Sequence, residues 1–393
     1  MFWAQQSAST LLNPPFALSL AIMFAGLTCL VKKKYMLAVI CFGVLSFIKI
    51  YAGVLVLGAL FCGALYDYFR NKRLDYFKVF LGSLLLAVVL FLPLNRSSGK
   101  VLVWQPGWFL ETMMAVSDRV NWPKYYEAMI NYRAAHNWPK FIVAYVIAGV
   151  IFLAGNLGLR IVGLLSLRKI DTMSVVLGSI TLAGFLLPMV LLQKGTPWNT
   201  IQFLYYALTI MGVFAAFTLS KLNWKLSLLT FTLLSAPGIW GTVKQYLPAR
   251  PPAMISSAEL EALNYLQLQP QGTVLTIPFD KAKADAAQAK PPRPLYRYES
   301  TGYIAAYTSH TTYLEDEVNL NITGYDWPSR RKQVEVFFKT QDQMLANKFL
   351  LDNRIRYVYL VAGERPVLGE GELNGKEIFA NPEVTIWKIN LSD

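Results

Sequence analysis

The fold class is decided by the stretch LLNPPFALSLAIMFAGLTCLVKKKYMLAVICFGVLSFIKIYAGVLVLGALF, residues 11–61. Three lysines at residues 32–34 separate two long apolar regions, and a single lysine, Lys49, interrupts the second region. An apolar α-helix of about 20 residues crosses the hydrocarbon core of a bilayer, and shorter helices are tolerated where flanking side chains reach the interface. The stretch therefore predicts membrane-spanning helices that are joined by very short turns.

The same pattern continues to residue 240. Hydrophobic residues make up 54% of the 393-residue chain and charged residues 16%, against about 25% charged residues in soluble domains. We expect a polytopic α-helical membrane bundle in residues 1–249. Its eight expected spans are Pro15–Val31, Tyr35–Ile48, Ala52–Tyr66, Val79–Pro93, Phe141–Leu159, Ser174–Leu192, Ile201–Leu219 and Leu226–Trp240.

The orientation of the bundle follows from its basic residues, because cytoplasmic loops are enriched in lysine and arginine. Every second connection is short and basic, and we expect these connections in the cytoplasm. Their basic residues are Lys32, Lys33, Lys34, Arg70, Lys72, Arg73, Lys78, Arg160, Arg168, Lys169, Lys221 and Lys225. The segments 94–140 and 193–200, the C-terminal part and the N-terminus are then outside. Because no charged signal peptide precedes the first span, we expect the chain to be the remainder of a longer protein.

The outer segment 94–140 is rich in tryptophan, tyrosine and methionine. Its stretches 108–120 and 122–140 are typical of amphipathic helices that lie at the headgroup level. Such helices would either anchor the protein or cover a lipid substrate.

Residues 250–393 return to an ordinary soluble composition, and we expect them to form an extracytoplasmic α/β domain. Ser256 and Glu259 predict a capping box. Helices are expected in 256–267 and 330–352, strands in 273–278, 356–362 and 384–390, and a mobile loop in 280–294. No phosphate-binding loop or nucleophile elbow is present, so the domain is expected to bind or brace rather than catalyse.

The formal net charge of +13 does not indicate nucleic-acid binding, because many basic residues lie in the short connections between apolar runs. The chain has only two histidines, His136 and His310, and no CxxC pair. We expect no metal site and no cofactor.

The first hundred residues resemble the middle of membrane glycosyltransferases of the C-type (GT-C) fold, and most closely the polyprenyl-phosphate-dependent mannosyltransferases. In that family an Asn-Pro element opens one span, and a later helix ends in a Lys-x-Tyr-Pro-like element at the outer face. Asn13-Pro14 and Lys49-Ile50-Tyr51 match these elements, with Ala52 in place of the proline. The resemblance implies that Lys49 and Tyr51 contact a lipid-linked sugar donor. The alternative for Lys49 is a lysine that marks the turn between two helices and extends its charge to the membrane interface. The family's catalytic acidic residue lies on an earlier outer loop, so it is assigned to no residue of this chain.

A second group of polar residues is expected at the same face. Lys194, Trp198, Asn199, Gln202, Tyr205 and Tyr206 surround the turn between the sixth and seventh spans. Asn199 and Gln202 could hold sugar hydroxyl groups, Trp198 could stack on a sugar, and Lys194 could pair with a phosphate. The alternative is an ordinary turn within an aromatic belt.

Three acidic groups have weaker functional interpretations. Glu111 and Asp118 could act as general acid or base, although exposed acids on an amphipathic helix are usually only solvated. His310 with the run 315–317 could suggest a metal, although a solvated loop is the simpler interpretation.

The leading hypothesis is a membrane glycosyltransferase, or a fragment of one, that transfers a sugar from a polyprenyl-phosphate donor to an envelope lipid, glycan or protein. Its partners would be the lipid-linked donor and membrane lipids, without nucleic acid, in a prokaryotic plasma membrane. The alternatives are a non-catalytic protein of the same architecture that binds or scaffolds envelope glycans, and a membrane transporter. A transporter would show an internal repeat and polar residues at the midplane, and the sequence shows neither.

Overall fold

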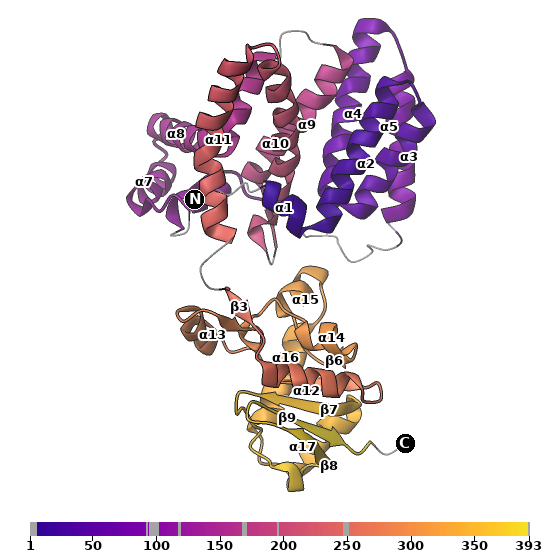
Figure 1. Ribbon diagram of the computed structural model, residues 1–393, viewed down its shortest axis with the longest axis vertical. Coiled ribbons are helices and arrows are strands. Elements are labelled where there is room, and N and C mark those ends of the chain that lie inside the picture. Colours follow the sequence, from indigo (N-terminus) through magenta and orange to yellow (C-terminus); the bar gives the residue numbers. More distant parts are fainter. Residues whose placement is uncertain are drawn as a thin grey trace. The chain divides into compact units, whose positions relative to one another are not determined.

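The computed structural model describes residues 6–91, 93, 102–116, 119–166, 171–194, 196–246 and 251–391 (Figure 1). The chain divides into two compact units, Met1–Tyr246 and Leu247–Asp393, which we call the helical unit and the sheet unit. The boundary expected between residues 249 and 250 lies outside the described residues.

The helical unit consists almost entirely of helices. Its elements are α1 (Gln6–Leu12), α2 (Pro14–Val31), α3 (Tyr35–Ile48), α4 (Ile50–Asn71), α5 (Asp75–Phe91), β1 (Leu102–Trp104), α6 (Trp108–Ala115), α7 (Pro123–Ala134), α8 (Trp138–Leu157), η2 (Gly158–Ser166), α9 (Thr172–Val190), β2 (Leu191–Gln193), η3 (Pro197–Thr200), α10 (Ile201–Leu219) and α11 (Trp224–Tyr246).

Six helical segments among the described residues are long and apolar enough to cross a membrane, and they give the chain the architecture of an integral membrane protein. They are Pro14–Val31, Ile50–Asn71, Trp138–Ser166, Thr172–Val190, Pro197–Leu219 and Trp224–Lys244. The other two expected spans correspond to α3 and α5, which have 14 and 17 residues. These two helices are shorter than a usual span, so the expected total of eight stays a prediction.

Two apolar cores hold the helical unit together. One core joins α2, α3, α4, α9 and α10 around Phe16, Phe42 and Leu55. The other joins α6, α7, α8 and α10 around Phe109 and Phe152. Helix α10 contributes residues to both cores and therefore links them.

Helices α4 and α9 are antiparallel and are joined by hydrogen bonds at both ends. The Tyr51 hydroxyl at the start of α4 donates to Gln193 Oε1 just after α9, at 2.5 Å. At the other end, the Thr172 hydroxyl at the start of α9 donates to Asp67 Oδ1 at 3.0 Å. Strands β1 and β2 pair antiparallel beside the first of these ends. We call that end, with Lys49, β1, β2 and η3, the hairpin end.

The sheet unit contains a five-stranded sheet in the order β6-β4-β7-β9-β8. Strand β4 (Thr273–Thr276) runs parallel to β6 (Thr311–Thr312) and β7 (Ile355–Val361). Strand β9 (Val384–Ile389) runs antiparallel to both β7 and β8 (Gly375–Ala380). A separate pair, β3 (Ala253–Met254) and β5 (Arg293–Pro294), is parallel.

Helices cover both faces of the sheet. The side chains of β7 point alternately to the two faces, and each face has its own apolar core. Val358 and Leu360 pack in one core with residues of α16 and α17, whereas Tyr357 and Tyr359 pack in the other with residues of α12 and α14. The helical elements of this unit are α12 (Ser257–Gln267), α13 (Lys281–Gln288), η4 (Leu295–Arg297), α14 (Tyr303–Thr308), α15 (Glu317–Thr323), α16 (Trp327–Lys339), α17 (Gln343–Asp352) and η5 (Glu370–Glu372).

Three local expectations for this unit are corrected. The loop expected in 280–294 contains α13, because Asp280 caps the helix and Ala284 is buried. The single helix expected in 330–352 is two helices, because the Asp342 side chain accepts from two backbone N–H groups and starts a new one. The capping box is half formed: Ser256 Oγ accepts from Glu259 N at 3.0 Å, while the Glu259 carboxylate accepts instead from the Tyr303 hydroxyl.

Candidate functional site

Lys49 forms the whole connection between α3 and α4. Its N–H donates to the Leu45 carbonyl at 2.7 Å, and its own carbonyl accepts from Ala52 N and Gly53 N at 3.0 and 3.2 Å. The two helices approach so closely that a Cβ on Gly53 would lie 2.7 Å from Ser46 Cα. The half-buried Lys49 side chain places Nζ 5.7 Å from the centroid of the Tyr51 ring. One residue therefore ends one helix, begins the next and presents a cation at the hairpin end.

A chain of hydrogen bonds leads from Tyr51 to the turn before α10. Tyr51 donates to the Gln193 side chain, and Gln193 Nε2 donates to Thr196 Oγ1 at 3.2 Å. Asn199 Nδ2 donates to the same Thr196 oxygen at 2.9 Å. The structure thus connects Tyr51, two residues after Lys49, with Asn199, which is far away in the sequence. Gln193 and Thr196, which link them, were not among the expected site residues, although both lie in the polar turn between two apolar runs.

Gln202 supplies an unused acceptor one helical turn after Asn199. Its Oε1 atom is buried and has no hydrogen-bond partner among the residues that the structure describes. Most buried side-chain polar atoms have a partner, and an orphan in a native protein calls for an explanation such as a ligand or a water. Lys194, between Gln193 and this turn, is exposed.

Trp198 is packed within the protein rather than free to stack. Its ring centroid lies 5.0 Å from that of Trp108 and 5.1 Å from that of Phe109, and the Arg119 guanidinium lies 5.9 Å from it. Tyr206 is fully buried, and its hydroxyl is hydrogen bonded to Ser19 at 2.6 Å. Tyr205 packs against Phe16 with ring centroids 5.6 Å apart. These three aromatic rings therefore support the turn from within the cores.

Glu111 differs from the solvated acid that the amphipathic pattern suggests. It is buried, with the Arg133 guanidinium at 2.5 Å and the Tyr145 hydroxyl also donating to it. Gly107, at φ +87°, precedes it, and a Cβ there would lie 2.7 Å from the Tyr145 ring. Because this carboxylate already accepts hydrogen bonds from Arg133 and Tyr145, Glu111 and Arg133 form a structural ion pair. Asp118 lies outside the described residues.

His310 and the acidic run 315–317 are not a solvated loop. His310 is buried, its Nδ1 lies 3.2 Å from both the backbone N and the carbonyl oxygen of Gly272, and its Nε2 lies 2.9 Å from the Leu266 carbonyl oxygen. The imidazole ring therefore links the chain around Gly272 with the end of α12. The described residues contain no group of three or more His, Cys, Asp or Glu side chains that could hold a metal ion.

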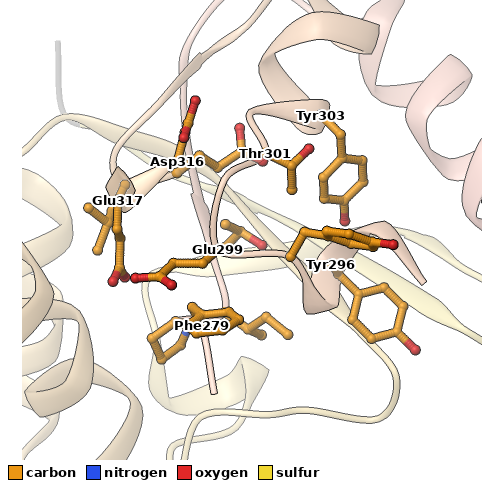
Figure 2. Close-up of a pocket in the computed structure, with 13 residues that line it drawn as sticks. Phe279, Tyr296, Glu299, Thr301, Tyr303, Asp316 and Glu317 are labelled. Atoms are coloured by element: carbon orange, nitrogen blue, oxygen red, sulfur yellow. The ribbon is translucent and has the colours of Figure 1, made fainter. Parts of the chain in front are cut away.

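A small cavity of about 40 Å³ lies where β4 ends in the sheet unit (Figure 2). The residues that line it include three tyrosines, Phe279 and four acids, Glu299, Glu315, Asp316 and Glu317. Figure 2 shows the Glu299 and Glu317 side chains pointing toward one another. Ligands often bind beyond the carboxyl ends of parallel strands, and aromatic rings with carboxylates suit a hydroxyl-rich or cationic group.

The acids of this cavity are not equivalent. Burial raises the pKa of Glu315 to about 7, although its carboxylate accepts from Ile304 N and Ala305 N, both at 3.2 Å. Burial also raises the pKa of Glu317, against the opposing effect of Arg331 at 2.5 Å. Glu315 can therefore exchange a proton near neutral pH, whereas Glu317 is held in an ion pair.

No family model and no curated protein matches this chain in comparisons with known proteins.

Proposed function

We propose that the chain is a membrane glycosyltransferase, or part of one, that takes a sugar from a polyprenyl-phosphate donor at the hairpin end. The observation that carries the proposal is the hydrogen-bonded path from Tyr51 through Gln193 and Thr196 to Asn199. This path connects two groups of residues. One is the Lys-x-Tyr element, which resembles the donor-binding element of the family. The other is the turn whose side-chain amides, those of Asn199 and Gln202, suit the hydroxyl groups of a sugar. Gln202, one helical turn after Asn199, supports the proposal further, because its buried Oε1 atom accepts from none of the described residues.

The chemistry assigns different roles to these groups. A base removes the proton of the acceptor hydroxyl, the acceptor oxygen attacks the anomeric carbon, and the bond from that carbon to the phosphate oxygen breaks. Polyprenyl phosphate leaves with an added negative charge, which Lys49 and Lys194 would stabilise as hydrogen-bond donors. Asn199 and Gln202 would hold sugar hydroxyl groups. The base is assigned to none of the described residues, since Glu111 is engaged by Arg133 and Tyr145.

That engagement of Glu111 favours one alternative, a non-catalytic protein that binds envelope glycans with the same residues. The two functions differ in turnover. An enzyme releases polyprenyl phosphate when donor and acceptor are both present, whereas a binding protein retains the intact donor. Thin-layer analysis of a donor with a radiolabelled sugar, incubated with the chain and envelope extract, separates them.

The binding test compares the wild type with Lys49→Met and Lys194→Met in nanodiscs. Each variant removes a charge but keeps an apolar side chain of similar length. Loss of a hydrogen bond to a charged group costs roughly 1.5–3 kcal/mol, so affinity for a polyprenyl-phosphate sugar should fall about 10- to 100-fold. Lys221→Met, in the connection between α10 and α11, is the matched control and should leave affinity unchanged. Equal affinity in the wild type and both variants, with unchanged thermal unfolding, would refute the proposed site.

A further inference from the structure

A groove of about 440 Å³ lies between α7 and the start of α8, and none of its lining residues is among those proposed to bind the donor. It is lined by Tyr125, Tyr132, Pro139, Lys140, Val143, Ala144 and Ile147. Apart from Lys140 and the two tyrosine hydroxyls, this lining is apolar. The groove therefore combines one fixed cation with a hydrocarbon-like surface.

The wall formed by α7 is fastened to α8 rather than loosely attached. The Tyr125 hydroxyl donates to the Ala144 carbonyl at 2.9 Å, and Met129 is completely buried in the core shared with α8. The start of α8 is fixed as well, because the Asn137 side chain accepts from Lys140 N and Pro139 lies in the first turn. The groove is thus part of the folded unit before any ligand arrives.

The chemistry of the groove changes along α8. Lys140 stands in the first helical turn, and Val143, Ala144 and Ile147 follow at spacings of three, four and seven residues, which is one face of a helix. Since α8 opens a segment long and apolar enough to cross a membrane, its first turn lies at the interface and the later turns lie in hydrocarbon. Trp138, which is 55% exposed, begins this turn, as interfacial tryptophans do. The cation is therefore at headgroup depth, and the apolar lining is at acyl-chain depth.

We propose that this groove binds one anionic phospholipid, with its phosphate at Lys140 and one acyl chain along Val143, Ala144 and Ile147. Charge complementarity favours an anionic lipid. Lys140 is exposed, its Nζ lies 5.7 Å from the Tyr132 ring centroid, and no carboxylate is among the residues that line the groove. Of the other charged groups on α7, Arg133 is paired with Glu111, while Lys124 and Glu127 have opposite charges. A small soluble anion would leave the apolar part unfilled, and a second protein would have to displace lipid from α8. The site is independent of sugar transfer.

The experiment is native mass spectrometry of the full chain released from detergent with phosphatidylglycerol or phosphatidylcholine of the same acyl chains. The wild type should retain one bound molecule of phosphatidylglycerol at a collision energy that removes phosphatidylcholine. A basic residue near an anionic lipid contributes about 1 kcal/mol, so Lys140→Met should weaken the retention of phosphatidylglycerol about fivefold. Lys225→Met, at the first turn of another helix, should leave it unchanged. Ile147→Trp and, independently, Val143→Phe should reduce the retention of phosphatidylglycerol by filling the groove, although both variants keep Lys140.

Three results would overturn the proposal. One is equal retention of the two lipids by the wild type, and another is an unchanged preference in Lys140→Met. The third is displacement of the bound phosphatidylglycerol by glycerol phosphate at the same concentration, which would identify a site for soluble anions. Because none of these measurements uses a sugar donor, their failure would leave the proposed transfer reaction untouched, and the reverse also holds.

Discussion

Two buried carboxyl groups, Glu111 of the helical unit and Glu315 of the sheet unit, are compensated in different ways. In the helical unit, Glu111 is neutralised by Arg133 and receives a second hydrogen bond from Tyr145. In the sheet unit, Glu315 accepts from two backbone N–H groups, and Glu259 accepts from the Tyr303 hydroxyl. A cation compensates a buried charge directly, whereas neutral donors offset only part of the desolvation cost.

Three carboxyl groups of the sheet unit make its stability depend on pH. Burial raises the pKa of Glu315 to about 7 and also raises the pKa values of Glu259 and Glu317. All three raised pKa values change stability in the same direction. Each carboxyl group holds its proton more tightly in the folded unit than in the unfolded chain, so each contributes less stability as the pH rises. The stability of the sheet unit should therefore fall as the pH rises, and Glu315 is the group that titrates near neutral pH.

The largest expected effect is a loss of sheet-unit stability as the pH rises. The pKa of Glu315 is about 7 in the folded unit against an ordinary value of 4.5. Between these values the folded unit keeps a proton that the unfolded chain has lost. The contribution of Glu315 is complete below the ordinary value and falls as the pH approaches the folded value, by up to about 3 kcal/mol. Glu315→Gln removes the titrating group and keeps an oxygen acceptor for one of the two N–H groups of Ile304 and Ala305. The variant should be less stable at low pH, but its stability should fall less as the pH rises.

Hydrogen–deuterium exchange of β7 peptides during urea titrations of the full chain, at about pH 5 and pH 7.5, measures this effect. Glu261→Gln is the matched control, because Glu261 is an exposed carboxylate on α12. It should leave the difference between the two urea midpoints as it is in the wild type. An equally large fall in Glu315→Gln would show that the sensitivity comes from elsewhere, with Glu259 and Glu317 as the next candidates.

The second effect concerns the ion pair of the helical unit. Arg133→Met leaves the Glu111 charge buried with Tyr145 as its remaining donor. Removing one partner of a buried pair typically costs 3–5 kcal/mol, but the Arg133 side chain is 45% exposed, so a loss of about 2 kcal/mol is expected. Adding Glu111→Gln to Arg133→Met should restore part of the stability, because no charge then remains unpaired. Thermal unfolding in nanodiscs measures both variants, and a double variant less stable than Arg133→Met alone would contradict the comparison.

The sequence predicts features that depend on nearby residues. The one-residue interruption at Lys49 marks the connection of two helices, and Ser256 accepts from Glu259 N as its spacing predicts. Asn13-Pro14 begins α2 in the same local way, with Asn13 as cap and Pro14 in the first turn. Each depends on a few neighbouring residues, so a single sequence is enough.

Features that depend on distant partners could not be predicted in this way. The pairing of β1 with β2 joins residues 102–104 to residues 191–193, and nothing in either short stretch specifies the other. The side chain of Glu259 turns to Tyr303, 44 residues away, instead of completing the capping box. Glu111 looks solvated because its helix is short and partly polar, and only the placement of Arg133 and Tyr145 shows it as buried.

The smallest expected effects come from removing one hydroxyl group from a buried carboxylate in each unit. Tyr145→Phe deletes a donor to Glu111, and Tyr303→Phe deletes the donor that lies 2.7 Å from Glu259 Oε1. Each substitution should reduce the free energy of unfolding by about 1 kcal/mol at pH 5, the usual value for one hydrogen bond.

The cost of Tyr145→Phe should be the same at pH 8, because Arg133 continues to pair with the Glu111 carboxylate. The cost of Tyr303→Phe should grow to about 1.5 kcal/mol at pH 8, because its hydroxyl lowers the pKa of Glu259 and its loss leaves the ionised form less stabilised. Unfolding of each unit in the full chain at both pH values is the measurement. If Tyr145→Phe were the more pH-dependent of the two variants, the ion pair would not be what distinguishes the units.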